Sequence, residues 1–152
     1  MAATVVETPI GPLGLVASER GLARVDFRGG RTEGDSEVLD EARAQLDAYF
    51  SGRLTEFDLP LDLAGTDFQR RCWLALATIP YGTTVSYGEQ SRRLGLGPES
   101  ARAVGAANGQ NPLPIVLPCH RVVGADGSLV GFGGGLHVKR ALLELEGAIL
   151  PV

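Results

Sequence analysis

The sequence predicts an α+β fold, in which a small antiparallel sheet with one helix precedes a helical half that contains a helix-turn-helix. Residues 3–28 alternate apolar and polar side chains between Gly/Pro turns, which is the period-two pattern of short antiparallel strands. Apolar side chains recur at helical spacing over roughly residues 36–51. Several short helical patterns separated by Gly and Pro follow. We therefore expect two domains, an α+β domain over 1–65 and a helical domain over 66–152.

The N-terminal pattern divides into three strands, a loop and a helix. Turn signals at 8–12 and 19–21 separate the strands, and a polar, glycine-rich loop covers 28–35. The helix over 36–51 has Gly52 just past its end, where a helix commonly stops. Residues 53–65 fit either a strand or a linker.

The C-terminal half opens with a capping-box sequence, Thr66-Asp67-Phe68-Gln69, which predicts a helix to about Thr78. Cys72 falls on the apolar face of that helix, so we expect it in the core. Ser86-Tyr87-Gly88-Glu89 is a second capping-box sequence and predicts a short helix that ends near Leu94.

A further helix over 101–108 consists mostly of small residues, so it can approach another surface closely. Two short helices joined by a glycine-containing turn fit a helix-turn-helix. Many such pairs are only packing units, so this pattern alone is weak evidence for DNA binding.

The segment 111–118 contains three prolines and no helical periodicity, and it predicts an extended, mostly buried stretch. Two β-prone runs around Asp126-Gly127 predict a hairpin over 122–130. Cys119 lies between these two segments, so we expect a rigid framework around its thiol.

Composition and charge limit the classes of function. Of the 152 residues, 44% are hydrophobic and 21% are charged, and no run approaches the roughly 18 apolar residues of a membrane span. Without a signal-peptide pattern, we expect a cytoplasmic protein with no membrane partner. Residues 1–65 carry 6 Arg/Lys against 12 Asp/Glu, whereas residues 66–152 carry 8 against 6. A polyanion such as DNA would therefore meet the second half.

Cys119 allows several interpretations, because it could be a small buried hydrophobe, a metal ligand, half of a disulfide or a nucleophile. The soft metal ligands are two cysteines and two histidines without zinc-site spacing, so we expect no metal. A disulfide with Cys72 is disfavoured in a reducing compartment. The adjacent His120 favours the nucleophile, because a base beside a thiol can generate the reactive thiolate.

Residues 68–146 contain an ordered set of short motifs. The motifs are Phe68-Gln69 with Trp73, Ile79-Pro80-Tyr81-Gly82, Ser86-Tyr87-Gly88, Arg102-Ala103-Val104-Gly105, Asn108-Gly109, Asn111-Pro112, Pro118-Cys119-His120-Arg121-Val122, Gly131-Phe132 with Gly134-Gly135, Lys139, and Leu142-Leu143 with Glu146. This ordered set resembles the O6-alkylguanine-DNA alkyltransferase family, and residues 1–65 fit that family's N-terminal domain.

The resemblance implies a catalytic group of four residues. Cys119 is the alkyl acceptor, His120 activates its thiol through a water, and Glu146 orients His120. Asn111 ties the helix-turn-helix to the segment that carries the thiol. Without the resemblance, Glu146 would be read as a solvated residue of a last helical turn, and Asn111 as part of a turn.

The resemblance also implies residues that bind the substrate. Tyr87 donates its proton toward the guanine ring, and Arg102 takes the place of the extruded nucleotide in the base stack. From the sequence alone, Tyr87 could equally be a core tyrosine. The other expected substrate-binding residues are Ser86, Arg121, Val122, Phe132, Gly133 and Lys139.

Two positions depart from the family pattern. Phe132 stands where relatives usually carry tyrosine, so a hydroxyl contact is lost. Gly133 replaces a larger residue and makes its loop more flexible.

The implied reaction transfers an alkyl group from O6-alkylguanine in duplex DNA to Cys119, without a cofactor and once per molecule. The implied protein is a monomer that binds the minor groove, and cooperative binding stays open. A non-catalytic lesion-binding protein on the same scaffold is the main alternative, and a thiol hydrolase or peroxidase is a third.

Overall fold

The computed structural model describes residues 1–151 and confirms the α+β class. The chain forms two compact units, Met1–Ala64 and Gly65–Val152. Each unit has its own buried residues and is described separately. None of the helices formed by the described residues has the length and hydrophobicity that crossing a bilayer requires.

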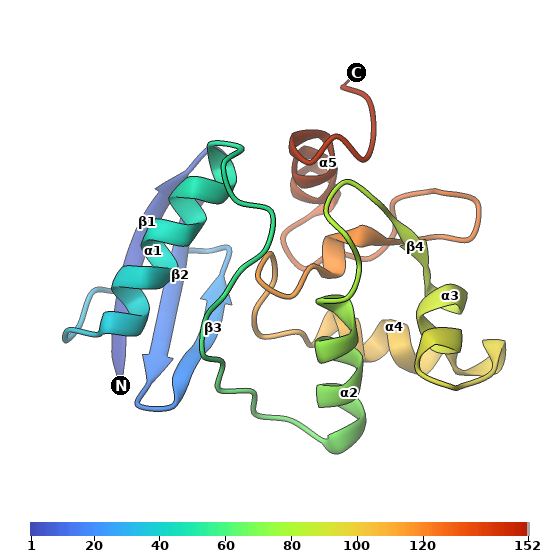
Figure 1. Ribbon diagram of the computed structural model, residues 1–152, viewed down its shortest axis with the longest axis horizontal. Coiled ribbons are helices and arrows are strands. Elements are labelled where there is room, and N and C mark those ends of the chain that lie inside the picture. The colour runs from blue at the N-terminus through green and yellow to red at the C-terminus, as the bar shows by residue number, and fades with distance from the viewer. Residues whose placement is uncertain (152) are drawn as a thin grey trace. The chain divides into compact units, whose positions relative to one another are not determined.

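Unit 1 (Met1–Ala64) contains a three-stranded antiparallel sheet in the order β1-β2-β3 (Figure 1). The strands are β1 (Ala2–Thr8), β2 (Gly11–Ser18) and β3 (Gly21–Asp26). Leu13, Leu15 and Ala17 of β2 point to the same side and are buried, as the alternating pattern predicts. The sheet therefore presents one apolar face to the helix that follows it.

Helix α1 (Glu37–Phe50) packs against this sheet. The Ser36 hydroxyl accepts a hydrogen bond from the backbone N–H of Leu39 at 3.2 Å and caps the helix. Gly52 has a φ of 77° just past the end, a conformation that suits glycine. Residues 53–64 form a linker rather than a strand, although Leu61 makes one bridge to Leu22.

Unit 2 (Gly65–Val152) consists of short helices and one two-stranded pairing. Its elements are α2 (Asp67–Leu76), β4 (Val85–Ser86), α3 (Tyr87–Arg93), η1 (Pro98–Ser100), α4 (Ala101–Gly109), η2 (Cys119–Arg121), β5 (Val122–Val123) and α5 (Leu136–Leu145). Helices α2 and α3 both pack against α4 (Figure 1). This arrangement matches the expected pair of short helices followed by the thiol segment.

The core of unit 2 explains why α2 and α4 stay together. Cys72 is fully buried against Val104 and Ala107, which confirms it as a core residue. The indole N–H of Trp73 donates to the Ala107 carbonyl at 2.7 Å. The Thr66–Gln69 capping box is formed in full and fixes the start of α2.

The second capping box is only half formed. The Ser86 hydroxyl accepts from the Glu89 N–H at 3.0 Å, as expected. The Glu89 carboxylate, however, pairs with Arg92 and Arg93 one turn along α3. The arginines compete for the carboxylate, because i,i+3 and i,i+4 neighbours face each other on a helix.

Two expectations about the thiol framework are wrong. No hairpin forms over 122–130, because β5 pairs in parallel with β4 instead, and only a turn closed by Gly124 N–H to Ser128 O at 2.8 Å remains. The segment 111–118 is buried but compact rather than extended. The Leu117 N–H donates back to the Leu113 carbonyl at 2.8 Å, and Ile115 adopts a left-handed φ of 76°.

Candidate active site

Cys119 is placed at the start of η2 by the compact segment before it. Its backbone N–H donates to the Leu117 carbonyl at 2.8 Å. The residue is half-buried and lines a pocket of about 180 Å³. The other lining residues are Tyr87, Gly105, Asn108, Gly109, Gly131, Phe132 and Gly133. The thiol is therefore reachable from a small concave site.

Asn111 holds the segment that carries the thiol. Its Nδ2 donates to the Leu117 carbonyl at 2.8 Å, and its Oδ1 accepts from the Leu113 N–H at 2.9 Å. These two bonds close the loop, which contains the left-handed Ile115. A β-branched residue in that conformation costs of order 1–3 kcal/mol and persists only where its surroundings enforce it. Asn111 is part of that enforcement.

His120 and Glu146 form a buried pair directly behind the thiol. His120 Nε2 lies 2.7 Å from Glu146 Oε2, and the residues are 0% and 5% exposed. The carboxylate contact assigns the imidazole proton to Nε2. Among the described residues, His120 Nδ1 has no hydrogen-bond partner although it is buried. An unpaired acceptor of this kind is suited to take a proton.

Burial shifts the pKa values of the thiol and the imidazole in opposite directions, and both shifts favour the neutral form. It lowers the pKa of His120, so the neutral imidazole is favoured despite Glu146. Burial also raises the pKa of Cys119, and the Asn111 amide and the Lys139 charge oppose this shift. The thiol therefore needs a base to become a thiolate at neutral pH.

Lys139 is fully buried on α5 and supports the pocket wall. Its Nζ donates to the carbonyls of Val122 at 2.7 Å and Val130 at 2.8 Å. The Tyr87 hydroxyl donates to the same Val130 carbonyl at 3.3 Å. The ammonium group of Lys139 therefore binds backbone carbonyls behind the loop, and the residue does not line the pocket.

Arg121 and Val122 also face away from the pocket. The Arg121 guanidinium, 5% exposed, donates to Glu146 and to the Ile79 carbonyl. The side chain of Val122 is fully buried in the core. The structure therefore places the side chains of Arg121 and Val122 outside the pocket lining.

The remaining expected residues fall into two groups. Tyr87, Phe132 and Gly133 line the pocket. Burial and the neighbouring Cys119 raise the pKa of Tyr87, which keeps its hydroxyl protonated. Ser86 caps α3 and so sets where Tyr87 begins the helix. Arg102 is exposed on α4, outside the pocket.

Four pocket residues received no role from the sequence, namely Gly105, Asn108, Gly109 and Gly131. A Cβ at Gly105 would lie 3.6 Å from the Tyr87 ring, so a small residue keeps α4 close to that ring. Asn108 is buried and exchanges hydrogen bonds with Gln90 at 2.7 and 3.2 Å. A buried asparagine in a helix of small residues was the available signal.

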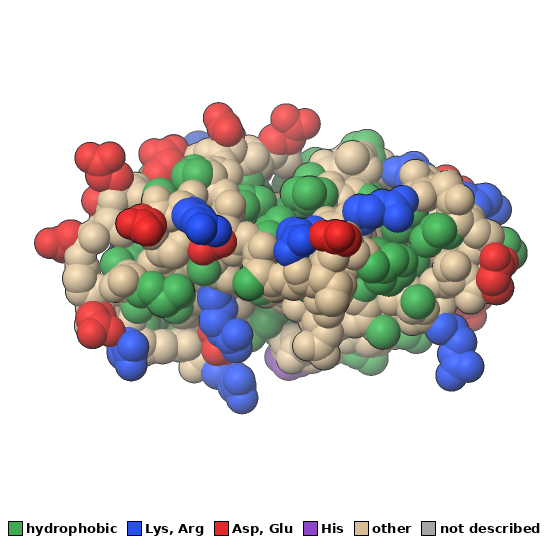
Figure 2. Space-filling model, turned by 90° about the horizontal axis from the view of Figure 1, so that it is seen from below, with side chains coloured by type: hydrophobic (Ala, Val, Ile, Leu, Met, Phe, Trp, Pro, Cys, Tyr) green, Lys and Arg blue, Asp and Glu red, His purple; other side chains and the backbone are tan. Residues whose placement is uncertain are grey.

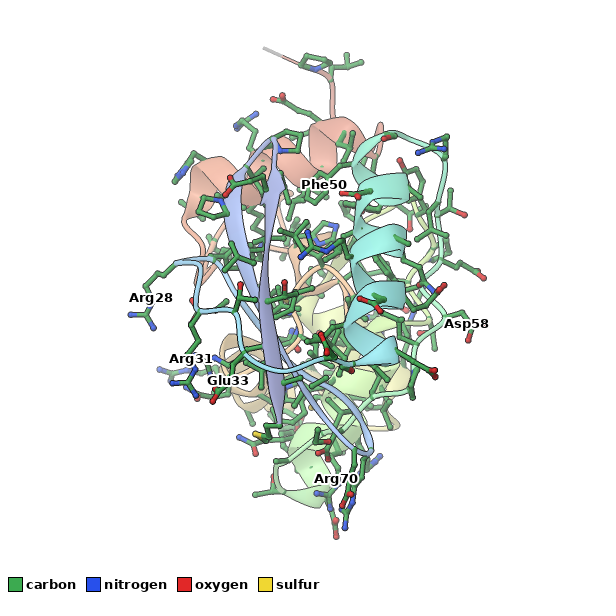
Figure 3. The ribbon with its side chains drawn as sticks, turned by 90° about the vertical axis from the view of Figure 1, so that its left-hand side faces the viewer. Arg28, Arg31, Glu33, Phe50, Asp58 and Arg70 are labelled. Atoms are coloured by element: carbon green, nitrogen blue, oxygen red, sulfur yellow. The ribbon has the colours of Figure 1, made fainter. Side chains whose placement is uncertain are left out.

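Unit 1 has a larger pocket of about 330 Å³, formed by the sheet and the loop after β3. On that loop, a terminal guanidinium nitrogen of Arg31 lies 3.0 Å from Glu33 Oε2, and Arg28 points outward (Figure 3). Residues 1–64 contain no cysteine or histidine. Nowhere in residues 1–151 do three metal-binding side chains gather. Both cysteines and both histidines of the chain lie in unit 2.

A pocket thiol backed by a buried histidine–carboxylate pair, in a unit built around two short packed helices, defines a class: helix-turn-helix proteins with a nucleophilic cysteine. Residues 67–148 match the 6-O-methylguanine DNA methyltransferase DNA-binding domain, and residues 1–63 match the ribonuclease-like domain of the same family. The chain belongs to the 6-O-methylguanine DNA methyltransferase family.

Curated relatives agree over nearly the whole chain. The methylated-DNA–protein-cysteine methyltransferase of Mycobacterium tuberculosis is 52% identical over 153 residues, covering 96% of this chain and 92% of the relative. The Methanosarcina acetivorans protein of the same name is 45% identical, with coverage of 95% and 97%. The crystal structure of Mycobacterium tuberculosis OGT in complex with DNA is 51% identical, with a TM-score of 0.86 and coverage of 95% and 91%.

Proposed function

We propose that this protein repairs O6-alkylguanine in duplex DNA by moving the alkyl group onto its own Cys119. The observation that carries the proposal is the pocket thiol of Cys119 with the buried His120–Glu146 pair behind it. The Nδ1 atom of His120 is free to accept a proton. The curated relatives bear the name of this activity. Duplex DNA is the partner, and the protein acts on it as a cytoplasmic monomer.

The first step generates the nucleophile. His120 Nδ1 takes the thiol proton through one water molecule, and Glu146 stabilises the imidazolium that forms. Asn111 and the Lys139 charge stabilise the thiolate against the cost of its burial. The thiolate is the reactive form, because a neutral thiol is a poor nucleophile.

The second step is an in-line displacement at the alkyl carbon. A sulfur–carbon bond forms, the bond between that carbon and O6 breaks, and its electron pair stays with the guanine. Tyr87 gives a proton to the ring, which neutralises the leaving base. The product thioether does not hydrolyse under cellular conditions, so each molecule reacts once and needs no cofactor.

The alkylated base must leave the duplex before this chemistry. A carbon attached to O6 of a stacked guanine is out of reach of a thiol in a pocket, so the nucleotide is extruded. Exposed Arg102 then occupies the gap in the stack. The exposed small residues Ala103 and Ala106 of α4 allow a close approach in the minor groove.

Charge is consistent with unit 2 as the DNA-binding part. Acidic side chains are frequent over unit 1 on the face shown in Figure 2. Residues 66–152 have a small positive excess, and three of the basic side chains, Arg92, Arg93 and Arg102, are exposed on α3 and α4. DNA affinity should therefore fall with salt along a shallow slope.

The experiment must separate transfer from lesion binding. A duplex with a single O6-methylguanine is incubated with an equimolar amount of protein, and its nucleosides are then analysed by mass spectrometry. We expect wild type and the core control Cys72→Ser to restore guanine, and Cys119→Ser to leave the lesion intact while still binding DNA. Persistence of the lesion with wild-type protein would favour the lesion-binding alternative.

A further inference from the structure

We propose that Arg121 is a positioning residue that acts through Glu146: it fixes the carboxylate so that His120 holds its proton on Nε2 and keeps Nδ1 open toward the thiol. The kinetic part of this inference rests on the proposed function. Its structural part, the tautomer and charge of His120, can be measured without any alkyl transfer.

Arg121 holds the Glu146 carboxylate in place by two hydrogen bonds. Arg121 Nε donates to Glu146 Oε1 at 2.8 Å, and one terminal nitrogen donates to Oε2 at 3.0 Å. This is a bidentate pair, which fixes the plane of a carboxylate as well as its position. His120 Nε2 meets that same Oε2 at 2.7 Å. Rotation of the carboxylate would therefore break contacts to both side chains.

Arg121 is itself held on its other side. Its second terminal nitrogen donates to the Ile79 carbonyl at 2.7 Å, and its guanidinium carbon lies 5.7 Å from the centre of the Tyr81 ring. The loop after α2 thus fixes the guanidinium, and the guanidinium fixes Glu146. Lysine could supply the charge but not this planar set of donors.

The positive charge of Arg121 also weakens the electrostatic effect of Glu146 on His120. A lone carboxylate beside a buried imidazole favours the imidazolium, which has no free acceptor and cannot take the thiol proton. A permanent cation on the same carboxylate weakens that preference. With Arg121 present, Glu146 still orients His120 through their hydrogen bond, but it does not make the imidazolium the favoured form in the resting state.

The elements packed around His120 carry other ionisable groups. Helix α5 brings Lys139 and Glu146, α3 brings Tyr87, and Cys119 precedes His120 in the chain. From α2, Cys72 is buried against α4, and Arg71 donates to the Leu94 carbonyl. Among these groups, within the described residues, Glu146 alone makes direct contacts with both His120 and Arg121.

The test uses Arg121→Met, Arg121→Lys and a control, Arg70→Met, which removes an arginine paired with Asp67 at the exposed start of α2. Nitrogen-15 NMR of labelled histidine reports tautomer and titration. The chain has two histidines, so exposed His137 serves as an internal reference. Rates of reaction with excess free O6-benzylguanine are measured across pH on the same samples.

We expect His120 of wild type and Arg70→Met to be the Nε2–H tautomer. In Arg121→Met, the loss of a buried cation should raise the titration midpoint of His120 by about one pH unit. The acid limb of the rate profile should move in the same direction. Arg121→Lys should keep the midpoint near wild type but give a mixture of tautomers.

The inference is wrong if folded Arg121→Met matches Arg70→Met in tautomer and midpoint. If Arg121→Met does not fold, a wild-type tautomer in Arg121→Lys overturns it instead. In a Glu146→Gln background, Arg121→Lys should leave the tautomer ratio unchanged, because its effect passes through the carboxylate. If the variants show the expected NMR changes but the wild-type protein transfers no alkyl group, the proposed function is rejected and the structural part of this inference stands.

Discussion

At the residue scale, three charged side chains, Arg121, Lys139 and Glu146, are buried behind one thiol. Arg121 and Glu146 neutralise each other, whereas Lys139 has no carboxylate within 4.0 Å among the described residues. A buried charge without a counter-charge is costly. The Cys119 thiolate would supply that counter-charge, so the lysine favours the ionised thiol.

We therefore predict that Lys139→Met raises the pKa of Cys119. Methionine is one atom shorter than lysine but fills most of the same space, and it removes the positive charge that lowers the pKa of the thiol. The pH dependence of Cys119 alkylation by iodoacetamide measures it, with Arg140→Met on the exposed side of α5 as control. An unchanged midpoint would mean that Lys139 only supports the Val130 loop.

The roles of these residues differ in how visible they are from the sequence. The Pro-Cys-His motif placed the thiol and its base next to each other. Glu146 is 26 positions from His120, and only the fold brings the two within 2.7 Å. The family resemblance placed Arg121 among the substrate-binding residues, but η2 turns its side chain toward Glu146.

At the element scale, α4 carries both a pocket residue and the exposed arginine that we propose to contact DNA. Its buried side contributes Asn108 to the pocket and Val104 to the core, while its exposed side carries Arg102. Helix α3 packs beside it and presents Tyr87. In the proposed function, the two helices thus combine DNA contact with pocket formation.

For Arg102→Ala we predict much slower repair of duplex DNA and little change toward the free base O6-benzylguanine. Only the duplex requires a side chain to fill the vacated stack, and unstacking costs a few kcal/mol. Single-turnover rates on both substrates test this, with Arg140→Ala as a matched control. Equal slowing on both substrates would assign Arg102 a structural role.

Elements with strong local signals were predictable, and those decided by distant partners were not. The Thr66 cap and the Ser36 cap depend on residues three positions away, so the starts of α2 and α1 follow from the sequence. The expected hairpin over 122–130 fails because β5 pairs with β4, more than 30 positions earlier. The compact loop before Cys119 depends on a left-handed Ile115, which no sequence pattern announces.

At the scale of the whole molecule, the Cys119 pocket and the buried charged side chains lie in unit 2. Unit 1 has a three-stranded sheet, one helix and no thiol or imidazole, whereas unit 2 contains the pocket, the buried charges and α3–α4. The charge difference between residues 1–65 and 66–152 parallels this division. We therefore predict that every covalent change occurs in unit 2, at the sulfur atom of Cys119.

The stoichiometry of modification tests that claim most directly. The protein is incubated with a large excess of duplex DNA containing O6-methylguanine, and its intact mass is followed until it is constant. We predict a gain of one methyl group per molecule, mapped to Cys119 by peptide analysis, for wild type and for Cys72→Ser, and no gain for Cys119→Ser. Methylation of Cys119→Ser, or repair of many lesions by unmodified wild-type protein, would contradict the account.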